Sequence, residues 1–280
     1  MTSAPGRPAE PFFLDGAPGR RFCLFHPPVG ACRGALLYVH PFAEEMNRSR
    51  RMAALQARAL AALGYGVLQI DLYGCGDSSG DFGDARWDIW KADLAAGAAW
   101  LRRRIDRPLT LWGLRLGALL ALDYARDARV PVQSMILWQP VLNGATFLTQ
   151  FLRLRLAGAM LDEGARTSTG ALRQALQGGE TLEIAGYDLA PALAAAIDGF
   201  DAPETLAPAC RVDWFEALPA PDAPLPAGAA RIGEAWRRGG ADLHLHALAC
   251  PPFWATPEIT ESPAWVQATS TALQEIADDA

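Results

Sequence analysis

Few histidines and no long apolar run occur in this chain of 280 residues, and both shortages restrict what it can do. A membrane-spanning helix needs about 20 consecutive apolar residues, whereas even an apolar run such as LGALLAL covers only residues 116–122. Residues 1–16 lack the apolar centre of a signal peptide. We therefore expect a cytoplasmic protein without a membrane span.

Clustered basic residues are also missing. The net charge is −6, and arginine and lysine are spread along the chain. A nucleic-acid site would need a concentrated basic surface. We therefore expect no nucleic-acid partner.

The five cysteines form no C-x-x-C pair, and their number is odd. They are Cys23, Cys32, Cys75, Cys210 and Cys250. Such a set is typical of a reduced protein with free thiols.

Asp242, His244 and His246 alternate along one apolar run, so in a strand they would share a face. This pattern could begin a metal site, but zinc needs about four ligands and no second ligand cluster accompanies it. We therefore expect no metal and no other cofactor.

Short apolar runs alternate with helical patterns through most of the chain. The runs predict strands over 11–14, 21–25, 35–40, 66–71, 108–112, 134–138, 210–215 and 242–248. The helical patterns cover 48–64, 87–105, 116–127, 229–239 and 262–277. This alternation predicts an α/β fold, with a mainly parallel sheet flanked by helices on both faces.

Residues 144–207 break the alternation. They contain helical patterns but no convincing strand. The sequence therefore predicts a core of residues 1–143 and 208–280, with an inserted helical cap at 144–207.

The run GLRLG (113–117) lies between a predicted strand and a predicted helix. Its glycine spacing is that of a nucleophile elbow, in which a sharp turn projects the middle residue above the sheet. Here the middle residue is Arg115, and an arginine cannot attack a carbonyl group.

Two further motifs follow neighbouring predicted strands. HPF (40–42) stands where an oxyanion-hole loop would be, and DLYGCGDSSG (71–80) has a D-x-x-G-x-G-x-S spacing. With the elbow, these motifs give the chain a resemblance to the α/β-hydrolases over nearly its whole length. The resemblance implies the α/β-hydrolase fold.

A narrower resemblance rests on the runs HPFAEEMNRSRRMAALQARALA, DLYGCGDSSGDF, GLRLGA and CPPFW. They are similar to the second type of exosortase A system-associated hydrolase, a bacterial family linked to exopolysaccharide and PEP-CTERM sorting loci. This resemblance implies a cytoplasmic accessory role, with exosortase-system proteins or a co-encoded hydrolase as partners.

A conventional serine hydrolase needs a nucleophile, a histidine base and a carboxylate. The nucleophile position holds Arg115, and the loop 249–263, where the histidine should lie, contains none. Only the carboxylate has candidates, Glu216 and Asp222. A Ser-His-Asp mechanism is therefore not expected.

Other residues could replace the missing groups. Cys250 is a possible nucleophile, although a buried thiol is usually inert. His40 and Glu44 are possible bases, although His40 is as well suited to orienting its loop by hydrogen bonds. A catalytic role for each of these three stays open.

A guanidinium at a helix N-terminus requires a nearby anion, because the helix dipole disfavours a cation there. Glu44 and Glu45 can supply the anion internally, or a ligand phosphate or carboxylate can. The predicted ligand-binding residues are Phe42, Glu44, Glu45, Arg115, Leu116 and Trp254.

Two functions remain from this sequence. One is hydrolysis of an acyl ester or thioester by an unusual set of residues. The other is a pseudohydrolase that binds an anionic or acyl ligand, or that serves as a structural partner.

Overall fold

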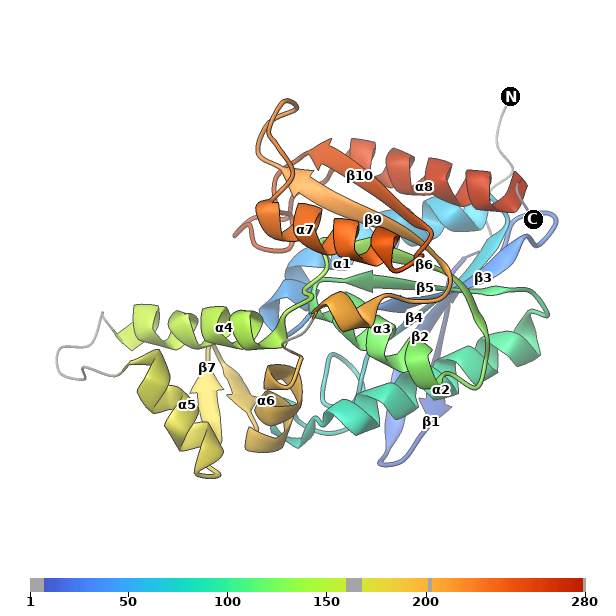
Figure 1. Cartoon of the computed structure of the whole chain (residues 1–280). Coiled ribbons are helices and arrows are strands. Elements are labelled where there is room, and N and C mark those ends of the chain that lie inside the picture. The colour runs from blue at the N-terminus through green and yellow to red at the C-terminus, as the bar shows by residue number, and fades with distance from the viewer. Residues whose placement is uncertain (1–7, 160–167, 201–202, 279–280) are drawn as a thin grey trace.

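One eight-stranded sheet, in the order β1-β2-β4-β3-β5-β6-β9-β10, runs through the computed structural model (Figure 1), which describes residues 8–159, 168–200 and 203–278. Its strands are β1 (Glu10–Asp15), β2 (Arg20–His26), β3 (Gly34–Val39), β4 (Tyr65–Ile70), β5 (Leu109–Leu114), β6 (Val132–Trp138), β9 (Arg211–Leu218) and β10 (Leu243–Ala249). Strand β2 pairs antiparallel with β1 and β4, and every other neighbouring pair is parallel. The mainly parallel sheet is as predicted.

Helices cover both faces of this sheet. They are α1 (Glu44–Ala62), α2 (Trp87–Arg104), α3 (Leu116–Asp127), α7 (Ala227–Arg238) and α8 (Pro263–Asp278), with short helices at Phe82–Asp84 (η1) and Pro203–Leu206 (η2). Alternate strand residues point to opposite faces: Leu36 and Tyr38 pack with α1 and α8, whereas Leu37 and Val39 pack with α2 and α3. Within the described ranges, no helix has the length and apolarity to cross a bilayer.

The segment between β6 and β9 forms a separate small layer, which Figure 1 shows beside one end of the sheet. It contains α4 (Gly144–Ala159), α5 (Thr169–Gln177), β7 (Leu182–Ile184), β8 (Tyr187–Leu189) and α6 (Pro191–Asp198). We call this segment the cap. Residues 160–167 and 201–202 of the predicted cap lie outside the described residues.

The hairpin β7–β8 corrects the prediction that the cap is purely helical. Each strand has only three residues, and the turn between them uses Ala185 and Gly186, both with positive φ. Strands this short carry too little alternation to be recognised, and Ala-Gly is a weak hairpin signal compared with Asn-Gly or Asp-Gly.

Candidate functional site

The elbow predicted at GLRLG has a strained backbone. Arg115 has φ 56° and ψ −120°, and it lies between the end of β5 and the start of α3. Position 117, two residues after Arg115, requires glycine. A Cβ there would come within 2.4 Å of the carbonyl oxygens of Val39 and His40. The loop after β3 and the start of α3 are therefore in close backbone contact.

Two other residues at this carboxyl edge of the sheet also have positive φ without being glycine. They are Ala43, at 50° just before α1, and Gln139, at 42° just after β6. Side-chain-bearing residues rarely adopt such angles, which cost on the order of 1–3 kcal/mol each and are commonest at functional sites. Strained residues therefore lie in the loops on both sides of the elbow.

Arg115 forms an ion pair with Glu45. Its Nε lies 3.2 Å from Glu45 Oε1, and the two side chains are 19% and 22% exposed. Its two terminal nitrogens make no hydrogen bond to any residue in the described part of the chain. Among the described residues, only Nε of this guanidinium has a partner, and the two terminal nitrogens have none.

The Glu45 carboxylate is incompletely satisfied. Its Oε2 is buried and has no hydrogen-bond partner among the residues described. Burial raises the pKa of Glu45 above its ordinary value, although Arg115 opposes that rise. A rise in pKa makes protonation of this carboxyl easier, and a protonated carboxyl can donate a hydrogen bond.

Trp254 forms one wall beside the elbow residue. The Arg115 guanidinium carbon lies 5.7 Å from the centre of the Trp254 ring. Arg48 in α1 donates to the Ala255 carbonyl at 2.9 Å and pairs with Glu44 at 2.7 Å. Thus Glu45, rather than Glu44, is the acid that contacts the elbow.

His40 already uses both ring nitrogens. Its Nδ1 lies 2.8 Å from the Pro41 carbonyl, and its Nε2 is 3.2 Å from the Leu72 amide. The amide must donate to Nε2, so Nδ1 carries the proton. Burial lowers the pKa of His40, and the neutral ring joins the loops that follow β3 and β4.

Aromatic side chains fill the space beside the elbow. The Phe42 ring makes edge contacts with Phe82, Trp90, Phe147 and Phe151 at centroid distances of 5.0 to 6.1 Å. Phe147 and Phe151 come from α4 of the cap.

The cavity beside these rings measures about 10 Å3, roughly the space for one water molecule. Its lining includes Phe42, His40 and Leu116. The predicted ligand residues Phe42 and Leu116 therefore lie together, at a very small pocket.

A buried carboxylate lies near the end of β9. Glu216 accepts hydrogen bonds from Trp214 Nε1 at 2.8 Å and from Gln139 Nε2 at 2.7 Å. Burial raises its pKa, and the positive charge of Arg115 lowers it. Of the two candidate acids, Glu216 thus interacts electrostatically with the elbow.

Gln139 links this acid to the strand ends. The side-chain oxygen of Gln139 accepts a hydrogen bond from the backbone amide of Ala217 at 2.7 Å. The backbone amide of Gln139 donates to the Phe215 carbonyl at 2.7 Å. The sequence analysis did not identify Gln139. Its position directly after a predicted strand was the available signal.

The Cys250 thiol is in an environment that disfavours the thiolate. Burial raises its pKa to about 11, and the side chain of Ser262 lowers it by less. Because the thiolate is the nucleophilic form, little of it exists near neutral pH.

The D-x-H-x-H pattern divides into two separate pairs. His244 bonds to Asp242 at 3.0 Å, whereas His246 bonds to the fully buried Asp213 at 2.8 Å. Among the described residues, no group of three or more acidic, histidine or cysteine side chains is arranged to hold a metal ion.

The chain matches the family of hydrolases described as serine aminopeptidase, S33, over residues 30–174, slightly more than half of its length. The match contains the HPF loop, the 71–80 turn and the elbow. A sequence search of curated proteins found no match.

Solved structures of α/β-hydrolases resemble the whole chain. Est1E from Butyrivibrio proteoclasticus with ferulic acid bound has a TM-score of 0.69 at 14% identity, covering 94% of this chain and 98% of that one. Mouse alpha/beta hydrolase domain-containing protein 10 gives 0.64 at 13%, covering 97% and 99%. A thermostable carboxyl esterase from Bacillus coagulans gives 0.65 at 14%, also covering 97% and 99%.

At such low identities, the three structures establish the fold alone. The family match adds the sequence motifs that surround Arg115. The chain belongs to the serine aminopeptidase S33 family and has the α/β-hydrolase fold.

Proposed function

We propose that this protein is a non-catalytic member of its hydrolase family that binds an anionic acyl ligand at Arg115. The observation that carries the proposal is the bonding of Arg115: Nε binds Glu45, while both terminal nitrogens bond to no described residue. A guanidinium with two free parallel donors matches a carboxylate or phosphate group.

The ligand's head group would accept hydrogen bonds from the terminal nitrogens of Arg115, whose guanidinium carbon lies 5.7 Å from the centre of the Trp254 ring. Glu45 limits which head groups fit, because its carboxylate repels a second negative charge when it is ionised. Its raised pKa makes the protonated form more accessible, and that form donates to a ligand oxygen instead. Binding of an anion should therefore favour a protonated Glu45.

The ligand's acyl chain would replace aromatic contacts beneath the cap. Phe147 and Phe151 of α4 stack edge-on against Phe42, where the cavity is now about 10 Å3. An apolar chain inserted between α4 and Phe42 would keep this space dry. Entry therefore requires α4 to move away from the core.

A second candidate function is hydrolysis of an acyl ester or thioester by unusual residues. Family membership favours it, as do neighbours that include a carboxyl esterase and a lipase. Against it stand the bonded ring of His40 and the raised pKa of the Cys250 thiol. Glu44 is paired with Arg48, which leaves it poorly placed as a base.

Binding of decanoate, measured by calorimetry, tests the first proposal, and methyl decanoate is the uncharged control. Arg115→Gln should weaken decanoate binding by at least 5-fold. Arg51→Gln is the matched control, since Arg51 is an exposed arginine of α1 paired with Glu261. Equal decanoate affinity in wild type and Arg115→Gln would sink the proposal.

Turnover of p-nitrophenyl esters and acyl thioesters separates the two functions. We expect no turnover by the wild type between pH 5 and 9, and no efficient esterase in Arg115→Ser, because loop 249–263 supplies no histidine base. A wild-type activity abolished by Glu44→Ala, His40→Ala or Cys250→Ala would establish the second function instead. A burst of acylation in Arg115→Ser would contradict the expectation for that variant.

The motif resemblance to exosortase A-associated hydrolases supports a cytoplasmic role in that system. There the protein would pair with exosortase-system proteins or with a co-encoded active hydrolase. Affinity purification of the tagged protein from its native host tests this partnership. Recovery of no protein from those loci would refute it.

A further inference from the structure

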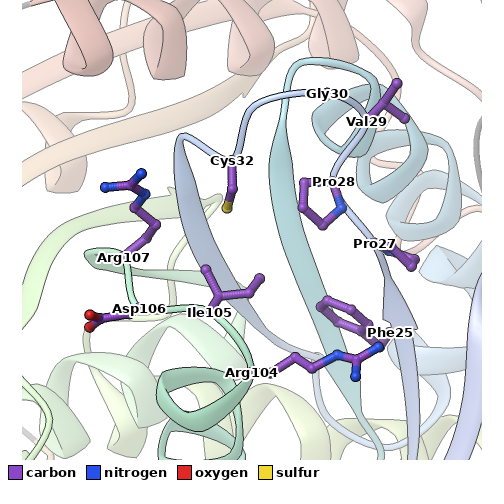
Figure 2. Close-up of a pocket in the computed structure, with 10 residues that line it drawn as sticks. All are labelled: Phe25, Pro27, Pro28, Val29, Gly30, Cys32, Arg104, Ile105, Asp106 and Arg107. Atoms are coloured by element: carbon purple, nitrogen blue, oxygen red, sulfur yellow. The ribbon is translucent and has the colours of Figure 1, made fainter.

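A wide groove lies at the edge of the sheet opposite to the elbow. It measures about 960 Å3 and is formed at the amino edge of the sheet, where β3 and β5 begin and β2 ends (Figure 2). Its walls come from the loop 27–32 and from residues 104–107, directly after α2. Ligand pockets commonly have volumes of about 300–1,000 Å3.

One wall of the groove is apolar and rigid. It contains Pro27, Pro28, Val29 and Ile105. The loop is fixed to the neighbouring helix because the Val29 amide donates to the Ala61 carbonyl at 2.9 Å. Because the loop contains two prolines and its backbone is anchored, it loses little conformational entropy when a ligand binds.

Two arginines line the same groove. Arg104 is bonded to Glu10 at 3.0 Å and lies over the Phe25 ring at 5.7 Å. Arg107 has no ion pair or side-chain hydrogen bond to any described residue. The Asp106 carboxylate opposes the charge of Arg107, and Figure 2 shows both side chains on the same side of Ile105.

Helix capping does not explain Arg107. Cations in the last turn of a helix compensate its dipole, and Arg102, Arg103 and Arg104 occupy that turn of α2. Arg107 lies three positions after the helix end, in a turn where its amide donates to the Ile105 carbonyl at 3.0 Å. This arginine therefore belongs to the groove rather than to the helix.

We infer that this groove is a second ligand site, which binds a compact ring-bearing anion. The anionic head, a carboxylate or a phosphate, pairs with Arg107, and the ring body packs on Pro28, Val29 and Ile105. The rigid wall and the large width suit a flat ring better than a flexible chain. The site is independent of Arg115, which lies at the opposite edge of the sheet.

Cys32 provides a reporter inside the groove. Figure 2 shows its thiol facing Ile105 across the pocket, and the side chain is partly accessible. A bound ring would cover this thiol. Alkylation of Cys32 by iodoacetamide, followed by peptide mass spectrometry, therefore reports occupancy at this position in the wild-type chain.

The experiment uses 8-anilinonaphthalene-1-sulfonate as a fluorescent probe, with 1-naphthoate and 1-naphthyl phosphate as competitors. Arg107→Gln should weaken probe binding by at least 5-fold. Arg103→Gln, which removes an exposed arginine of α2 outside the groove, should change it less than 2-fold. Stronger competition by 1-naphthoate or by 1-naphthyl phosphate identifies the head group as carboxylate or phosphate.

Saturating probe should slow Cys32 alkylation at least 5-fold in the wild type. Arg115→Gln should bind the probe normally, and Arg107→Gln should bind decanoate normally, so the two sites can fail separately. Unprotected Cys32, or equal losses in Arg107→Gln and Arg103→Gln, would overturn the inference. So would competition by neither naphthyl compound.

Discussion

The two edges of the parallel strands differ in how much space they leave. At the carboxyl edge, an Arg–Glu pair lies at the elbow, and the cavity that Phe42 and Leu116 line measures about 10 Å3. At the amino edge, a groove of about 960 Å3 is open. The space that Phe42 lines is thus much smaller than the groove at the opposite edge.

The difference shows that the position of a motif does not fix how much open space lies beside it. The elbow turn depends on backbone geometry, on Gly117 and on the strands that meet there. Open space depends on the side chains that surround it, and here Phe42 and the cap fill it. The backbone of the elbow and the volume of the space beside it are therefore set by different residues.

The largest expected effect comes from the pair that fixes the carboxyl-edge loop 71–80. Asp93 bonds to buried Arg21 at 2.6 Å and accepts from the Tyr73 amide at 2.8 Å. Asp93→Ala would leave a buried guanidinium unpaired and should lower the free energy of unfolding by about 3–5 kcal/mol. Urea denaturation measures the loss.

Asp88→Ala, an exposed residue of the same helix, should cost less than about 1 kcal/mol. Similar losses in the two variants would mean that the Arg21–Asp93 pair does not fix this edge.

A smaller effect should follow from opening the filled pocket. Phe151→Ala removes a buried ring that contacts Phe42 at 5.0 Å, and it should cost about 3 kcal/mol. It should also strengthen decanoate binding, because the acyl chain no longer has to displace that ring. Leu154→Ala, on the exposed face of α4, should change neither quantity. Unchanged decanoate affinity in Phe151→Ala would show that this ring does not limit entry of the ligand.

The smallest effect concerns pH and the loop that His40 holds. Burial and Arg50 lower the pKa of His40, while Asp71 and the Pro41 carbonyl raise it. Because the folded pKa lies below the unfolded one, the stabilisation is full above pH 6.5 and is lost as pH falls through the folded pKa.

His40→Asn should therefore make the fall in unfolding free energy below pH 6.5 less steep. Urea titrations at a series of pH values measure this slope. Parallel curves for the variant and the wild type would rule out His40 as its source.

The sequence predicted most of the sheet because its strands are short apolar runs between clear helices. The helix predicted over 116–127 has the same first and last residues as α3, because the elbow glycines and the apolar run make this helix easy to recognise. The hairpin β7–β8 was missed because three-residue strands carry no usable period.

The site could be predicted only where one motif contains it. Arg115 and its need for an anion follow from GLRLG, and the structure selects Glu45 from two neighbouring acids. Gln139 and Glu216 are 77 positions apart, so their bond depends on β6 and β9 lying side by side. Phe151 lies far along the chain from Phe42, and the cap's packing alone joins them.

The three strained residues around the elbow also bear on how this protein could be stabilised. At Ala43, Arg115 and Gln139 the backbone adopts angles that glycine tolerates without strain. Glycine normally weakens a fold, but relief of this strain can outweigh its entropy where the lost side chain contributes little. Ala43 loses only a methyl group, so this position is the natural starting point for engineering a more heat-resistant form.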